Sequence, residues 1–137
     1  MIIGSDETLK GDSFGGLIVC AVKLGDEMES QVSAMGVRDS KKLSPIQIEL
    51  IAERLMELVP YSVKELNPTQ YNQEISKHGM TQVLNNLHAA AIAELYEDGA
   101  RVIVDKYPGC KVDGAEMLTK AEDQFTAVAA ASIIARS

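Results

Sequence analysis

The sequence feature that most constrains the fold is the final segment, residues 122–137, which is rich in alanine and apolar on nearly every side. A helix that is apolar all round has to be enclosed by the rest of the molecule. The chain has 137 residues, which is enough for one core of ordinary size. We therefore expect a single domain over residues 1–137, with this helix packed deeply inside it.

The first part of the sequence predicts three strands. Residues 1–5 are an apolar run, residues 14–24 are rich in β-branched and other apolar side chains, and residues 28–37 alternate loosely. Short turn-like segments separate these runs, as in sheets whose neighbouring strands are antiparallel. The pattern predicts that the sheet begins with an antiparallel three-stranded meander.

The next element has clear helix signals. After a polar loop, Ser44 is a good N-cap, Pro45 suits the first helical position, and Gln47 stands where a capping box has its second partner. Apolar residues then recur at intervals of three and four until Pro60. We expect a helix from Pro45 to the residues just before Pro60.

Strands and helices alternate in the remainder. Residues 61–66 and 101–105 predict strands, while residues 67–77 and 81–97 predict a short and a longer helix. Strands that alternate with helices form layered α/β domains. The fold class we expect is α/β, with a mixed central sheet flanked by helices.

Charge and hydropathy limit the classes of partner. The net charge of −7 argues against a general cationic surface for nucleic acid, although acids that hold divalent cations lower the charge of a protein that meets phosphates through those cations. No apolar run is long enough to cross a membrane, and the N-terminus does not resemble a signal peptide. We expect a cytoplasmic protein without a membrane partner.

The cysteines and histidines form no metal-binding pattern. Cys20 and Cys110 belong to no paired motif, so we expect free thiols rather than a disulfide or a zinc site. His78 and His88 lack ligand spacing as well. We expect His78 on the surface and His88 packed or hydrogen-bonded.

Acidic residues fall at the predicted ends of elements. Asp6 and Glu7 follow the first strand, Asp105 ends a late strand, and Glu122 and Asp123 open the final helix. Strand ends and helix starts border the crevice of an open α/β sheet, so these acids can meet there. Carboxylates that converge repel one another unless cations bind, and oxygen ligands favour Mg²⁺ or Mn²⁺.

Each acid also has an ordinary structural interpretation. Asp6 and Glu7 could be a solvated strand end, and they would point to opposite faces unless the strand stops at Asp6. Asp105 could begin a turn, and Glu122 could form a capping box with Thr119. For Glu122 the residues alone leave capping and metal binding open.

A polar loop over residues 38–44 contains Ser40, Lys41 and Lys42. It could be a solvated charged loop, or a clamp whose hydroxyl and ammonium groups bind phosphates.

Taken together, the motifs resemble a known family. The chain contains, in order, GSDETLKGDSFGG (4–16), GVRDSKKLS (36–44), NPTQYNQEISKHGMTQVLNNLHAAAIAEL (67–95), VIVD (102–105) and KAEDQFTAVAAASIIAR (120–136). In order and spacing these segments resemble the type 2 ribonuclease H lineage, most closely its type 3 branch, the ribonucleases HIII. The NPxxYN run and the later LHA point to type 3.

The resemblance implies an RNase H-like fold that hydrolyses the RNA strand of an RNA–DNA hybrid with Mg²⁺ or Mn²⁺. It implies four catalytic, metal-binding acids: Asp6, Glu7, Asp105 and Glu122, which lies ten places before Ser132, with Asp123 as the alternative fourth ligand. Two cations would share the reaction and leave 5′-phosphate ends. The implied substrate-binding residues are Lys10, Gly11, Ser40, Lys41 and Lys42.

The sequence also departs from the family pattern. Leu9 replaces a family glycine in the segment whose backbone reads the 2′-hydroxyl, and a leucine would resist a positive φ there.

The chain also resembles a minimal or truncated member, without the N-terminal substrate-binding domain and the C-terminal helices of the family. A homodimer is one way to supply the missing surface. Two alternatives therefore stand beside the nuclease: a catalytically weak or inactive module for hybrid binding or protein interaction, and a related two-metal nuclease with altered substrate preference.

Overall fold

One mixed sheet of five strands organises the molecule. The structure, a computed structural model, describes residues 1–9 and 16–137. The strands lie in the order β3-β2-β1-β4-β5, with β2 antiparallel to β1 and β3, and β4 parallel to β1 and β5. Their bounds are Ile2–Leu9 (β1), Leu17–Leu24 (β2), Tyr61–Leu66 (β3), Arg101–Asp105 (β4) and Glu116–Leu118 (β5). This confirms the predicted α/β class with a mixed sheet.

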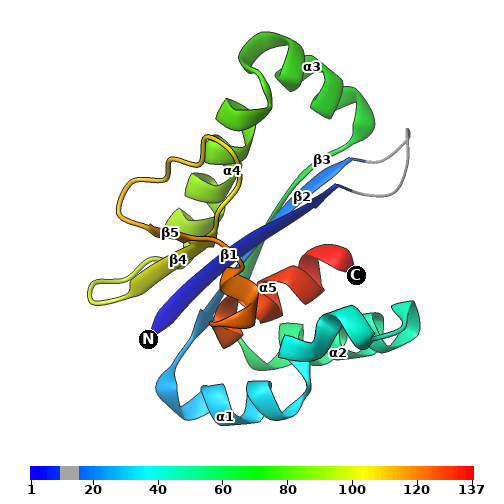
Figure 1. Cartoon of the computed structure of the whole chain (residues 1–137), viewed down its shortest axis with the longest axis vertical. Coiled ribbons are helices and arrows are strands. Elements are labelled where there is room, and N and C mark those ends of the chain that lie inside the picture. The colour runs from blue at the N-terminus through cyan, green and yellow to red at the C-terminus, as the bar shows by residue number, and fades with distance from the viewer. Residues whose placement is uncertain (10–15) are drawn as a thin grey trace.

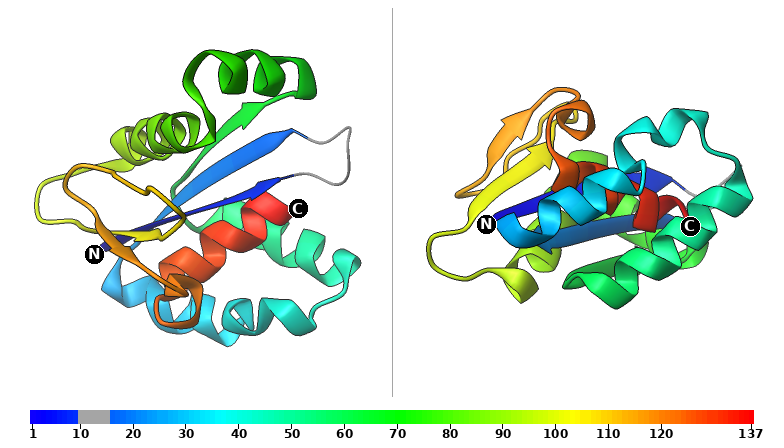
Figure 2. Two further views of the ribbon diagram at one scale, coloured as in Figure 1. Left: turned by 45° about the horizontal axis from the view of Figure 1, so that its top comes forward. Right: turned by 90° about the horizontal axis from the view of Figure 1, so that it is seen from below.

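Helices cover both faces of this sheet. The α-helices are Asp26–Ala34 (α1), Pro45–Leu58 (α2), Pro68–His78 (α3), Met80–Leu95 (α4) and Thr126–Arg136 (α5), and two 3₁₀ turns span Val37–Lys42 (η1) and Ala121–Asp123 (η2). Figures 1 and 2 show α1, α2 and α5 on one face and α3 and α4 on the other. Over residues 1–9 and 16–137, none of the helices has the length and hydropathy needed to cross a bilayer.

The prediction of a strand over residues 28–37 is wrong. Helix α1 occupies most of that segment, and the third antiparallel strand is β3, which pairs with β2 after α2. Three acids in the first turn of α1, Asp26, Glu27 and Glu29, suit the positive end of a helix dipole. Val32 is the one buried residue of α1. The loose alternation of apolar and polar residues in this segment therefore does not correspond to a strand with one buried face.

The helix predicted from Pro45 is confirmed together with its cap. The backbone N–H of Gln47 donates to Oγ of Ser44 over 3.2 Å, and the backbone N–H of Ser44 donates to Oε1 of Gln47 over 2.8 Å. The strands predicted over 61–66 and 101–105 also have the predicted bounds. Strand β5 was not predicted, because three residues are too few to show a period.

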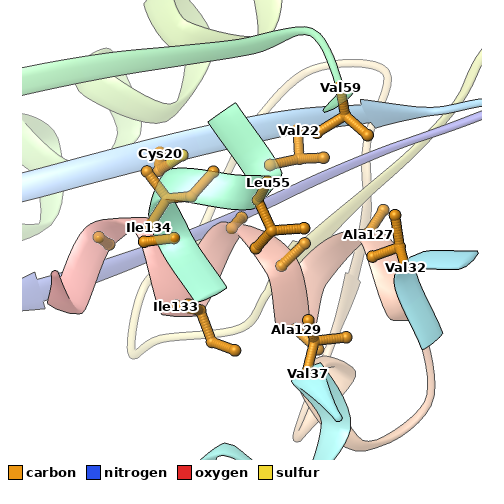
Figure 3. Close-up of a cluster of buried hydrophobic side chains, with 14 of the residues drawn as sticks. Cys20, Val22, Val32, Val37, Leu55, Val59, Ala127, Ala129, Ile133 and Ile134 are labelled. Carbon is orange, nitrogen blue, oxygen red and sulfur yellow. The ribbon is translucent and has the colours of Figure 1, made fainter. Parts of the chain in front are cut away.

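The final helix is deeply packed, as its composition predicts, but it begins at Thr126 rather than at residue 122. From Thr126 to Ala135 every residue of α5 is buried. Figure 3 shows Ala127, Ala129, Ile133 and Ile134 among side chains of β2, α1, η1 and α2. The side chain of Val59, which follows α2, belongs to the same cluster. The alanines let α5 lie close to the sheet, since a small side chain allows two backbones to approach.

Strand β1 and helix α5 approach each other closely at Gly4. A Cβ placed on Gly4 would lie 2.4 Å from the backbone nitrogen of Val128 and 2.5 Å from the carbonyl carbon of Ala127. Neither atom can move away without shifting α5 itself. Gly4 therefore sets the distance between the central strand and the buried helix.

We expect Gly4→Ala to lower the free energy of unfolding by about 2 kcal/mol or more, because the added methyl group overpacks the contact between β1 and α5. Gly25→Ala is the matched control, since its Cβ would meet only the flexible end of Glu27, at 2.9 Å. The control should cost about 1 kcal/mol at most. Urea unfolding followed by circular dichroism measures both, and equal losses would contradict this explanation.

Candidate active site

The register of the sheet brings two of the predicted acids together where β4 ends beside β1. Ser5 of β1 pairs with Val104 of β4, so Asp6 and Asp105 are the next residues along each strand. Strand β4 ends at Asp105, and Oδ1 of Asp105 accepts a hydrogen bond from the backbone N–H of Ala121 over 3.0 Å. This bond fixes η2, and with it Glu122, beside the carboxyl end of β4.

The four acids are near enough to influence one another's ionisation. Burial raises the pKa of Asp6 from 3.8 to about 8, and the charges of Glu7, Asp105 and Glu122 add to this effect. The Asp6 side chain is only 5% exposed, and its Oδ1 accepts from the backbone N–H of Glu7 over 2.8 Å. The convergence of Asp6, Glu7, Asp105 and Glu122 therefore centres on a buried carboxyl group.

Asp105 is affected in the same direction. Burial raises its pKa above 3.8, and the charges of Glu122 and Glu7 strengthen the shift. Hydrogen bonds from the Ala121 N–H and the Asp6 side chain partly oppose it. Two carboxyl groups in one place thus resist ionisation, which is what acids without a counter-charge do.

The sequence analysis expects Asp6 and Glu7 to share a role only if the strand stops at Asp6, and the strand does not stop there. Strand β1 continues to Leu9, and alternate residues face opposite sides of the sheet. Gly4 faces α5, so Asp6 does too, whereas Glu7 faces His88 of α4. Both side chains nevertheless influence the pKa of Asp105, which lies at the end of β4 beside β1.

The alternative roles weighed for Asp105 and Glu122 do not occur. The cap of η2 is Lys120, which makes no side-chain cap bond, so Glu122 forms no capping box with Thr119. Asp105 bonds to Ala121, far along the chain, rather than to a turn of its own. Neither Asp105 nor Glu122 is therefore explained by local backbone structure.

Glu122 and Asp123 differ in position. Glu122 is half-buried and its charge reaches both Asp6 and Asp105. Asp123 is exposed, and its backbone carbonyl accepts a hydrogen bond from Nη2 of Arg38. The geometry places Glu122, and not Asp123, beside the other acids.

The residues of the predicted phosphate-binding loop lie on a 3₁₀ turn. The segment expected as a loop over 38–44 is largely η1, which the Arg38–Asp123 hydrogen bond ties to η2 next to the acids. Lys41 and Lys42 are exposed, whereas Ser40 is buried. The two lysine ammonium groups are thus accessible to a ligand, and the Ser40 side chain lies inside.

The segment after the Asp-Glu pair is described only in part. Lys10 and Gly11 lie outside the described residues. Leu9 ends β1 opposite Leu17 and is 53% exposed. Of the non-glycine residues in the described ranges, only Lys120 has a positive φ, so Leu9 is not forced into the left-handed region.

The two histidines have the environments expected from the sequence. His78 is exposed on α3, with Nε2 3.7 Å from Oε2 of Glu74. His88 is completely buried on α4 and contacts Ser5 and Glu7. The sequence predicts a packed or hydrogen-bonded His88 but not its partner, because the contact with Glu7 depends on how α4 packs on β1. The only local signal is a histidine on the apolar face of a helix.

The donor set of the site consists of carboxylate oxygens. Within residues 1–9 and 16–137, however, no three His, Cys, Asp or Glu side chains are arranged so that they could hold a metal ion. The four acids are near enough to interact electrostatically without forming a complete coordination shell. Their chemistry, and not a preformed shell, is what fits hard cations such as Mg²⁺ or Mn²⁺.

Comparison with known proteins finds the same fold in ribonucleases H. The chain is 37% identical to a ribonuclease HIII of Listeria monocytogenes serotype 4b, covering 98% of this chain and 50% of that protein. The structure of Bst-RNase HIII in complex with Mn²⁺ superposes with a TM-score of 0.85 at 33% identity, over 98% of this chain and 50% of that one. RNase H3 of Aquifex aeolicus gives a TM-score of 0.84 at 33% identity, over 98% and 55%.

The family assignment agrees with the resemblance seen in the motifs. The chain spans about half the length of the curated relatives it matches. Within that span the family model of ribonuclease HII matches residues 3–137, which include all four converging acids. The chain therefore belongs to the ribonuclease HII family.

Proposed function

We propose that this chain carries the active site of a metal-dependent endoribonuclease that hydrolyses the RNA strand of RNA–DNA hybrids. The observation that carries the proposal is the buried Asp6, whose pKa of about 8 reflects burial and the charges of Glu7, Asp105 and Glu122. A domain gains nothing in stability from such a cluster. Membership of the ribonuclease HII family supplies the reaction class.

Asp6, Glu7, Asp105 and Glu122 are the proposed catalytic and metal-binding residues. Their oxygen-only donor set suits Mg²⁺ or Mn²⁺, and the relative Bst-RNase HIII has been solved with Mn²⁺. Two such cations would activate the attacking water and stabilise the leaving 3′ oxygen, which leaves 5′-phosphate ends. The carboxylates hold and orient this site.

The remaining proposed roles concern the substrate backbone. Lys41 and Lys42 present exposed ammonium groups on η1, which η2 joins to the acids, so they suit phosphate contacts that carry no sequence information. Ser40 contributes through its backbone, since its side chain is buried. Lys10 and Gly11 are the proposed contacts to the 2′-hydroxyl, the group that distinguishes RNA from DNA.

The test is cleavage of an end-labelled RNA–DNA hybrid with Mg²⁺ or Mn²⁺. Single-stranded RNA, duplex RNA and an EDTA-treated sample serve as controls. We expect cleavage of the hybrid alone, dependent on the cation, with 5′-phosphate products. Binding of the hybrid without cleavage would support a non-catalytic hybrid-binding module instead, and cleavage of another duplex would support a nuclease with altered substrate preference.

The fourth ligand can be tested by a matched pair of substitutions. We expect Glu122→Gln to lower kcat by about 100-fold or more and Asp123→Asn to change it less than about threefold, because only Glu122 lies beside Asp6 and Asp105. Steady-state hydrolysis of the hybrid measures both variants. The reverse order of effects would assign the fourth ligand to Asp123.

A further inference from the structure

His88 links the interior of the domain to one of the proposed catalytic acids. Its side chain is fully buried, and Nε2 lies 2.9 Å from Oε1 of Glu7. On the other side of the ring, Nδ1 is hydrogen-bonded to Oγ of the buried Ser5. Ser5 and Glu7 are alternate residues of β1 on the same face of the sheet, so one imidazole spans both side chains.

The ring of His88 is also held by its flat face. It stacks on Tyr107 with the ring centroids 5.2 Å apart and the planes at 24°. The Tyr107 hydroxyl donates to Oδ1 of Asn85 over 2.6 Å, and the same Oδ1 accepts from the backbone N–H of Lys111 over 2.9 Å. Tyr107 lies in the loop that follows β4 and is fixed by its bond to Asn85 of α4, so it leaves His88 little freedom to rotate.

From this arrangement we propose that His88 is a positioning residue that fixes the carboxylate of Glu7 in the active site. The inference rests on the proposed function, in which Glu7 is a metal ligand. Glu7 is only partly covered, with 23% of its side chain exposed, and one hydrogen bond from a rigid partner restricts its rotamers. Residues that orient a metal-binding side chain in this way typically change metal affinity or activity 10- to 100-fold when they are lost.

The hydrogen bonds define the tautomer of the ring. An ionised carboxylate can only accept hydrogen bonds, so Nε2 of His88 carries the hydrogen that it shares with Glu7. Nδ1 then accepts from the hydroxyl of Ser5, which can donate. His88 does not touch the reacting atoms, and it acts only through Glu7.

Two amide substitutions that differ by one methylene group test the proposal. The side-chain amide of His88→Gln reaches the position of Nε2 and can still donate to Glu7, whereas that of His88→Asn reaches only the position of Nδ1. We expect His88→Gln to stay within about threefold of the native kcat and His88→Asn to lose about 10- to 100-fold. The KM for the hybrid should change little in either variant.

Two readouts besides activity accompany the assay. Mn²⁺ affinity, measured by water-proton relaxation on the whole chain, should fall for His88→Asn and be retained by His88→Gln. Thermal unfolding in EDTA reports the loss of packing, which both variants share. Equal losses of kcat in both variants, in proportion to their thermal stability, would overturn the proposal, as would native Mn²⁺ affinity in His88→Asn.

Nitrogen NMR of the metal-free native protein separates this inference from the proposed function. We expect Nε2 of His88 to be the protonated ring nitrogen, and its signal to shift in Glu7→Gln. A protonated Nδ1 with a bare Nε2 would overturn the inference whatever the activity. Absence of cleavage together with the expected His88 signals would contradict the nuclease and leave the pairing of His88 with Glu7 intact.

Discussion

Asp6→Asn should abolish hydrolysis of the hybrid, lowering kcat by about 1,000-fold or more. Asparagine keeps the shape of the side chain and can still accept from the N–H of Glu7, but it removes the charge from the buried centre of the four acids. Electrostatic stabilisation by charged groups and by the cations they hold is strongest in the transition state. Removing the Asp6 charge should therefore lower kcat. Gel-based cleavage under single-turnover conditions measures the effect.

The matched control is Asp98→Asn, which makes the same chemical change at an exposed turn. It should retain the native rate. Hybrid binding, measured by fluorescence anisotropy, should survive in Asp6→Asn because the exposed lysines of η1 are untouched. Native kcat in a folded Asp6→Asn protein would remove Asp6 from the proposed catalytic residues.

The second expected result concerns stability and pH. Without divalent cations, the free energy of unfolding should fall as pH rises from about 5 to 8. In this range folded Asp6, with a pKa of about 8, keeps a proton that the unfolded chain, with its ordinary value of 3.8, has released. Since the folded state then binds more protons, stability falls with pH by up to about 1.4 kcal/mol per pH unit. The raised pKa of Asp105 acts in the same direction.

Urea unfolding in EDTA at several pH values measures this slope. Asp6→Asn should flatten the profile and be more stable than the native protein near pH 8, because it carries no buried charge. Saturating Mg²⁺ or Mn²⁺ should restore stability at pH 8, because cations bind the ionised carboxylates. Parallel profiles for the native protein and Asp6→Asn in EDTA would show that Asp6 ionises normally.

Local signals in the sequence predict most of the elements. Ser44, Pro45 and Gln47 determine the start of α2 by contacts within one turn, and the β-branched run before Asp105 is sufficient for β4. The sequence does not predict helix α1, because only one of its residues is buried. Its apolar residues therefore follow neither the helical period nor the strand period clearly. The start of α5 was placed too early because residues 121–123 form a separate 3₁₀ turn that is held by Asp105.

The residues of the proposed site can be selected from the sequence, but their geometry cannot. The motifs identify Asp6, Glu7, Asp105 and Glu122, yet their proximity depends on the parallel pairing of β1 with β4 and on the bond between Asp105 and Ala121. The role of His88 depends on the packing of α4 against β1. These contacts join residues far apart in the chain, and no local pattern encodes them.

The contact between Gly4 and α5 has a consequence for protein synthesis. Strand β1 leaves the ribosome before the other strands of the sheet, but its parallel neighbour β4 and the helix that packs on Gly4 are made only after the segments between them. Pairings between distant segments form late, because the intervening chain must be closed first. The acids of β1 therefore cannot be assembled with those of β4 and η2 on a nascent chain until α5 has emerged, so the proposed site forms only after the last of these elements has been made.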